Sequence, residues 1–145
     1  MSAEEYIKKR LDPQIIWYSK KSSINQKIYK RLQIAEIICA TLIPLFSAYS
    51  NMKYMSFIIG VFGALIAVIE SVSKLYKFHE NWIQYRITAE RLKREKYLFL
   101  SCSAQYIDVK ETAENIFIQN IEDIISFENK NWNQLNTQEE PLKKS

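Results

Sequence analysis

Two glutamates stand at the edges of long apolar runs, where a carboxylate is uncommon. Glu36 comes directly before the first run and Glu70 directly after the second. An ionisable group inside a membrane helix is by default a candidate for handling ions, and a ring of acidic residues at a pore mouth favours cations. The alternatives are structural: Glu70 pairs with Lys74 one helical turn later, and Glu36 extends to the polar interface.

A proline inside the first apolar run is a second candidate for a functional role. Pro44 has no backbone N–H, so it leaves the carbonyl of Ala40 without its helical partner and can kink the helix. A kink of this kind can gate a pore, and a static bend is the structural alternative. Glu36, Glu70 and Pro44 are therefore the candidate pore or gating residues.

The segment 78–100 combines aromatic and charged residues at helical spacing. Arg86, Glu90 and Arg94 follow one another at intervals of four, which predicts a charge ladder along one helix face. The ladder is either a gating or ligand-binding surface or the exposed side of a packed bundle. The segment is also basic with interleaved aromatic residues, as in nucleic-acid-binding patches, but proximity to a membrane accounts for the basic charge, so we expect no nucleic-acid partner.

Nothing in the sequence indicates catalysis or a bound cofactor. There is no glycine-rich phosphate loop, no nucleophile motif and no metal-ligand spacing. The single histidine, His79, has no evident catalytic or metal-binding partner, and Cys39 and Cys102 do not suggest a disulfide framework. We therefore expect no enzymatic activity, no cofactor and no metal site.

Two apolar runs dominate the middle of the chain. Residues 37–52 and 54–69 each contain sixteen residues without a charge, and only Lys53 separates them. A bilayer core of about 30 Å requires about 20 helical residues, so each run must borrow flanking residues to span it. The expected spans are residues 34–50 and 57–73, joined by an external loop at 51–56.

The alternative is a hairpin buried in a soluble bundle. Against it, residues 57–69 are apolar on every helical face, which a short soluble chain can hardly cover. Both glycines of the chain, Gly60 and Gly63, also lie in this run. Small residues let membrane helices approach closely. In this run four of them recur on one face and predict a helix-packing stripe: Gly60, Ala64, Ala67 and Ser71.

Charge asymmetry predicts the orientation. Residues 1–33 hold eight Lys and Arg against three acidic residues, and residues 74–106 hold seven against three. Because basic residues accumulate on the cytoplasmic side, both termini should be cytoplasmic. No secretory signal peptide is predicted, since the first apolar run starts too late.

The remaining chain should form a cytoplasmic helical bundle, which makes the whole a single all-α domain of 145 residues. A short helix over 3–11 precedes a new helix capped at Asp12-Pro13. One helix should run from Tyr54 to about Ser101, with a break at 103–107. A capping box, Asp108-x-x-Glu111, opens the last helix. Its apolar face comprises Val109, Ala113, Ile116, Phe117, Ile121, Ile124 and Phe127, and residues 137–145 form a frayed tail.

The residues now described resemble the SLATT family, two-transmembrane effectors found beside SMODS nucleotidyltransferases and SLOG sensors in bacteria. The resemblance begins at Arg10-x-x-x-Gln14-x-x-Trp17-Tyr18 and includes Asn25, Tyr29, Glu36 and Pro44. It is strongest over Phe78-x-Glu80-Asn81-Trp82-x-x-Tyr85-Arg86-x-Thr88-Ala89-Glu90-x-Leu92-x-x-Glu95, and Glu128-Asn129-x-x-Trp132 resembles the closing motif.

This resemblance implies a location in the bacterial inner or plasma membrane and a role in bacterial conflict systems, in which the family is expected to open membrane pores after a nucleotide signal. Two hypotheses follow. In the first, the chain is a homo-oligomeric pore or channel-like effector, with a nucleotide-signalling or sensor protein as possible partner. In the second, it is a non-conducting anchor whose cytoplasmic bundle recruits a partner.

Overall fold

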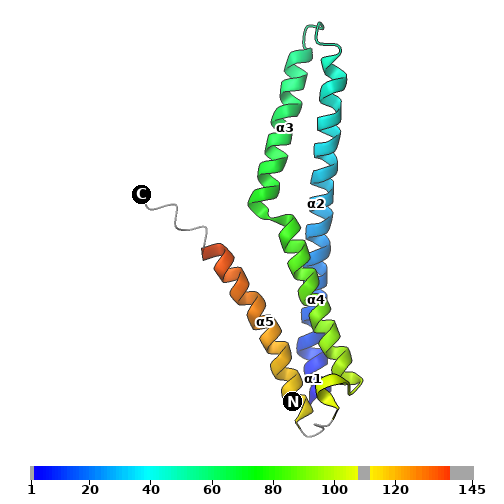
Figure 1. Ribbon diagram of the computed structural model, residues 1–145, viewed down its shortest axis with the longest axis vertical. Helices are drawn as coiled ribbons and strands as arrows, with labels where there is room; N and C mark the ends of the chain where they lie inside the picture. The colour runs from blue at the N-terminus through cyan, green and yellow to red at the C-terminus, as the bar shows by residue number, and fades with distance from the viewer. Residues whose placement is uncertain (1, 108–111, 138–145) are drawn as a thin grey trace. The chain divides into compact units, whose positions relative to one another are not determined.

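Every element in the part of the chain that its computed structural model describes, residues 2–107 and 112–137, is a helix (Figure 1). The predicted all-helical fold is therefore confirmed for these residues. In chain order the elements are α1 (Ala3–Tyr6), the π-helix η1 (Ile7–Leu11), α2 (Asp12–Ser47), α3 (Met55–Tyr76), α4 (Phe78–Leu100), the 3-10 helix η2 (Ala104–Tyr106) and α5 (Ala113–Thr137).

The chain forms two compact units. Residues 21–84 make up the hairpin unit, which contains most of α2, all of α3 and the start of α4. Residues 1–20 and 85–145 make up the bundle unit, which contains the N-terminal turns, most of α4, and α5. Each unit has its own packing.

The boundary at Asp12 lies where the sequence suggested, since α2 begins there, but the chain stays helical across it. Asp12 has helical backbone angles, φ −62° and ψ −42°, so it is not the extended N-cap that we expected. Its N–H reaches the carbonyl of Ile7, which closes a π-helical turn immediately before Pro13. Because Pro13 cannot donate to the next carbonyl, the wider turn lets the helix continue past it.

The hairpin unit consists of two antiparallel helices joined by a tight turn after Ser47 (Figure 1). The rings of Phe46 and Phe62 stack at 5.7 Å near this turn. The half-buried positions of both helices recur at three and four residues, as in a two-helix seam. On α3 they include Ile59, Phe62, Ile66 and Ile69.

One stretch within residues 55–106 is long and apolar enough to cross a membrane, and it is the one such stretch among the described residues. It coincides with the apolar part of α3. The apolar end of α2 does not qualify, because α2 stops at Ser47 and its last eighteen residues include Lys30, Arg31 and Glu36.

The predicted single helix from Tyr54 to about Ser101 is wrong at Lys77. Lys77 has φ 49° and ψ 43°, a left-handed conformation that separates α3 from α4. Its N–H still donates to the carbonyl of Ser73, and the Asn81 side chain donates to the carbonyl of Tyr76 at 3.1 Å. These two hydrogen bonds supply partners for backbone groups at the end of α3, so the helix can break here without a glycine or a proline. The predicted break near 103–107 is confirmed, since α4 ends at Leu100.

The bundle unit has a true core. Leu11, Leu92, Phe117 and Ile121 are fully buried, and the ring of Phe117 stacks on Phe99 at 4.3 Å. The buried face of α5 differs in part from the predicted face. Phe127 is 57% exposed, and Ile125 and Glu128 occupy the buried positions instead. The buried residues of α5 are spaced by four, four and three positions from Phe117 to Glu128, and this spacing does not include Phe127.

Three sequence expectations fall outside the described residues. The capping box at Asp108 and Glu111 and the apolar residue Val109 lie in the gap between 107 and 112. Most of the expected tail, residues 138–145, also lies outside the described residues, whereas its first residue, Thr137, is the last residue of α5.

Candidate functional site

The two candidate pore glutamates belong to the hairpin unit and already have polar partners. The Oε1 atom of Glu70 lies 2.9 Å from Nζ of Lys74, which is the ion pair anticipated as the structural alternative. Oε2 of Glu36 accepts a hydrogen bond from Nε2 of Gln33 at 3.2 Å. Glu36 also lies within electrostatic reach of Lys74. Both carboxylates are half-buried, so they lie toward the partner helix rather than on the fully exposed surface.

Pro44 lies inside the last turns of α2 without ending it, because the helix continues to Ser47. Its carbonyl accepts a hydrogen bond from the hydroxyl of Ser47 at 2.9 Å. Pro44 is exposed, as are residues 47–54, which lead into and form the turn that follows. A bend at this position would therefore move the end of the hairpin and leave the contacts around Glu36 unaffected.

The small-residue stripe of α3 faces away from α2. Gly60, Ala64, Ala67 and Ser71 are all exposed, and a side chain added at Gly60 would meet no atom within 4 Å. Larger residues such as Phe62 make the contact with α2 instead. The stripe therefore contributes nothing to packing within one hairpin, and any packing role that it has must involve another molecule.

The motif helix is divided between the two units. In the hairpin unit, Asn81 caps the turn at Lys77, and Trp82 lies 6.4 Å from the ring of Tyr29 and 5.6 Å from that of His79. Glu80 is exposed beside them. Asn81 and Trp82 thus fix the start of α4 and its contact with α2, a structural role.

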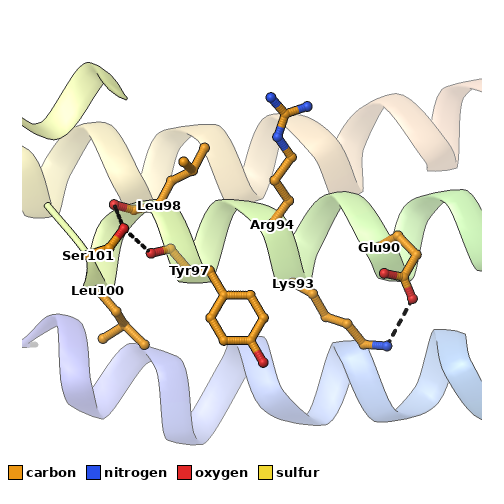
Figure 2. Close-up of a pocket in the computed structure, with 7 residues that line it drawn as sticks. All are labelled: Glu90, Lys93, Arg94, Tyr97, Leu98, Leu100 and Ser101. Atoms are coloured by element: carbon orange, nitrogen blue, oxygen red, sulfur yellow. Dashed lines mark hydrogen bonds and ion pairs between the residues drawn. The ribbon is translucent and has the colours of Figure 1, made fainter. Parts of the chain in front are cut away.

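The predicted charge ladder does not form among the described residues. Glu90 pairs with Lys93 at 3.1 Å and not with an arginine four residues away. Figure 2 shows Lys93 bent back toward Glu90, while Arg94 projects to the other side of α4. Arg86 is exposed as well. The surface pocket in Figure 2 lies along this single helix and has a mostly apolar floor that includes Tyr97 and Leu98.

Tyr85, the remaining motif residue, lies in a pocket of the bundle unit where three separate segments meet. Trp17 and Tyr18 come from α2, Tyr85 from α4, and the last wall from α5. The Tyr85 ring lies 5.7 Å from Trp17 in an edge-to-face arrangement and 6.1 Å from Tyr18. The pocket has a volume of about 550 Å³, and its α5 wall consists of Glu128, Asn129, Trp132 and Asn133.

A buried carboxylate lies in this pocket. Glu128 is 6% exposed, and its Oε2 accepts a hydrogen bond from the hydroxyl of Thr88 at 3.0 Å. Burial raises the pKa of the Tyr18 and Tyr85 phenols, and the nearby charge of Glu128 raises both further. Sequence reasoning placed Thr88 and Glu128 in motifs but gave them no role, because a site shared by three distant segments has no local pattern.

The comparison with known protein families gives one match. The model of DUF4231, described as a protein of unknown function, matches residues 13–114.

The chain belongs to the DUF4231 family.

The DUF4231 match covers the entire hairpin unit and α4, together with Trp17, Tyr18 and Tyr85 of the pocket. It ends at the start of α5, so Glu128 and Trp132 lie beyond it. No curated protein and no solved structure matches the chain. Function in this DUF4231 protein must therefore be argued from its own residues.

A second polar cluster in the DUF4231 chain joins the N-terminus to α5. Arg10 donates from Nε and Nη2 to the two oxygens of Glu122 at 3.0 and 3.1 Å, and the Tyr6 hydroxyl donates to the same carboxylate at 2.7 Å. These bonds and the Arg10 charge lower the pKa of Glu122, with partial burial acting in the opposite direction. Among the described residues no group of three His, Cys, Asp or Glu side chains forms a metal-binding arrangement.

Proposed function

We propose that this protein is a membrane-embedded, homo-oligomeric effector of a bacterial defence system that forms a pore or channel. The observation that carries the proposal is the surface of the hairpin unit. None of the 22 residues of α3 is buried, and large side chains such as Phe57, Val68 and Leu75 are 58–74% exposed. A helix apolar on every face is stable in lipid, where its backbone bonds are satisfied internally and its side chains need no protein cover.

In the proposed topology both arms of the hairpin span the bilayer. The turn between them carries Tyr49 and Tyr54, 63% and 66% exposed, which suits a membrane interface. The apolar part of α2 is shorter than that of α3, so the α2 span must include polar residues toward Lys30 and Arg31. The long side chains of Lys30 and Arg31 can extend to the lipid headgroups. The bundle unit and both termini are then cytoplasmic.

This topology is tested by thiol labelling in intact cells. With Cys39 and Cys102 replaced, single cysteines at Asn51 and Ser126 are exposed to an impermeant reagent. We expect labelling at position 51 and none at 126 until the cells are opened. Labelling at 126 in intact cells would rule out the proposed orientation.

Self-association is the next step, because two helices cannot enclose a water path alone. The exposed stripe of Gly60, Ala64 and Ala67 supplies a flat face on which another copy can approach closely. Ala64→Leu should therefore reduce the oligomer size in detergent, since the added side chain faces outward. Val61→Leu adds bulk to an exposed position off the stripe and is the matched control. Equal oligomer size in both variants would contradict assembly through the stripe.

Conduction is tested with purified protein in a planar bilayer under a salt gradient. Glu36→Gln should reduce cation preference more than Glu70→Gln, because Lys74 already offsets the charge of Glu70 at 2.9 Å. Current with unchanged selectivity in both variants would remove the glutamates from the pore.

A non-conducting membrane scaffold is the second candidate. The bundle unit favours it, because that unit has its own buried core and a pocket that can serve recruitment. The resemblance to the SLATT family suggests a nucleotide-signalling or sensor protein as the partner. Absence of current from the intact oligomer under every trigger tested would favour the scaffold over the pore.

A further inference from the structure

The pocket of the bundle unit is built mainly from aromatic rings. Trp17 and Tyr18 meet edge-to-face at 4.9 Å, and both rings lie within 6.1 Å of Tyr85. Trp132 forms part of the α5 wall and is 40% exposed at the rim. The faces of Trp and Tyr rings carry partial negative charge, so a set of them around one space attracts a cation.

The carboxylate of Glu128 adds a full negative charge to the same space. Among the described residues no Lys or Arg forms an ion pair with Glu128, and none of the seven residues that line the pocket is basic. Arg10, whose charge acts on the pocket residue Tyr18, donates to both oxygens of Glu122 instead. A buried charge is stable when an opposite charge accompanies it, and one hydroxyl bond from Thr88 satisfies only part of the carboxylate.

We propose that this pocket binds a small organic cation with an alkylammonium or guanidinium head. Glu128 supplies the counter-charge, and Trp17, Tyr85 and Trp132 supply the walls. A volume of about 550 Å³ is within the range of small-molecule sites. Anions are excluded by the carboxylate, and a neutral ligand would leave its charge uncompensated. The site is separate from the hairpin unit and goes beyond the proposed membrane function, so either can fail without the other.

Tryptophan fluorescence tests the proposal directly. The chain has three tryptophans, so Trp82→Phe leaves Trp17 and Trp132 as the only reporters, both at the pocket. The full-length variant is placed in phosphatidylglycerol nanodiscs and titrated with tetramethylammonium and guanidinium chlorides, with sodium chloride and neutral tert-butanol as controls. We expect a saturable change with at least one organic cation and none with the controls. A linear response to every compound, or equal responses to cations and tert-butanol, would overturn the proposal.

Variants then locate the site. Glu128→Gln keeps the shape and removes the charge, so affinity for the cation should fall at least tenfold. Asp123→Asn removes an exposed charge from the same helix and should change affinity less than twofold. Trp132→Leu, at the rim, should weaken binding severalfold and covers the case in which Glu128→Gln fails to fold. Wild-type affinity in both pocket variants, with helicity intact by circular dichroism, would refute the site.

The ammonium group of a lipid and that of a free metabolite have the same chemistry. Nanodiscs with the same phosphatidylglycerol fraction, completed either with phosphatidylethanolamine or with a neutral glycolipid, distinguish the two sources, because a bound headgroup would compete with added tetramethylammonium at equal surface charge. A weaker apparent affinity in the phosphatidylethanolamine nanodiscs would identify a headgroup, and an equal affinity would identify a soluble cation.

Discussion

The hairpin unit and the bundle unit use the same secondary structure, yet they treat apolar side chains differently. The bundle unit buries Leu11, Leu92, Phe117 and Ile121 completely. In residues 21–84, all of which the structure describes, Ser22 is the one buried residue. A helix in water gains stability by covering an apolar stripe, whereas a helix in lipid needs no such cover. This difference supports the proposal that the hairpin unit lies in lipid and the bundle unit in water.

The largest effect is expected in the core of the bundle unit. Phe117→Ala should lower the free energy of unfolding by about 3–5 kcal/mol, since it removes a fully buried ring and leaves a cavity. Phe127→Ala is the matched control on α5 and should cost less than about 0.5 kcal/mol, because that ring is exposed. Chemical denaturation followed at the tryptophans measures both. A similar loss in the two variants would contradict the core assigned here.

A charge on the hairpin surface tests the difference in solvent. Leu65, 45% exposed, lies in the middle of the apolar run. In a bilayer, Leu65→Lys should cost about 2.5–3.5 kcal/mol of insertion and reduce the carbonate-resistant membrane fraction. At an exposed site in water the same change should cost within about 0.5 kcal/mol. Asn51→Lys, in the turn, is the control. Normal membrane retention of the Leu65 variant would favour a soluble hairpin.

The smallest expected effect concerns the ion pair of the bundle unit. The pKa of Glu122 is lowered by Arg10, so its stabilising contribution is complete above the ordinary glutamate range and is lost as pH falls through the lowered value. Both side chains are nearly half exposed, so the contribution is about 0.5 kcal/mol. Glu122→Gln should therefore lower the thermal midpoint slightly at pH 7, and the difference from wild type should shrink as the pH falls below the ordinary glutamate range. A difference that persists in acid would exclude this linkage.

Periodicity and composition in the sequence were enough to predict the all-helical fold and the break after α4, whereas the turn that we expected at 51–56 begins earlier, because α2 ends at Ser47. These features are local, since apolar spacing and the scarcity of glycine and proline act within a few turns of chain. The interruption at Lys77 was missed for the same reason. No local residue type demands it, and hydrogen bonds to Ser73 and from Asn81 satisfy the backbone there.

The sequence by itself determined which segments are helical and which are apolar. Tertiary structure decided which face of each helix is used: Phe62 rather than the glycine stripe contacts α2, and Ile125 and Glu128 replace Phe127 in the bundle unit. It also decided that Trp17, Tyr85 and Glu128 surround one pocket, although about forty residues or more separate each from the next. Helical spacing acts between neighbouring turns, whereas a site shared by three helices depends on how those helices pack together.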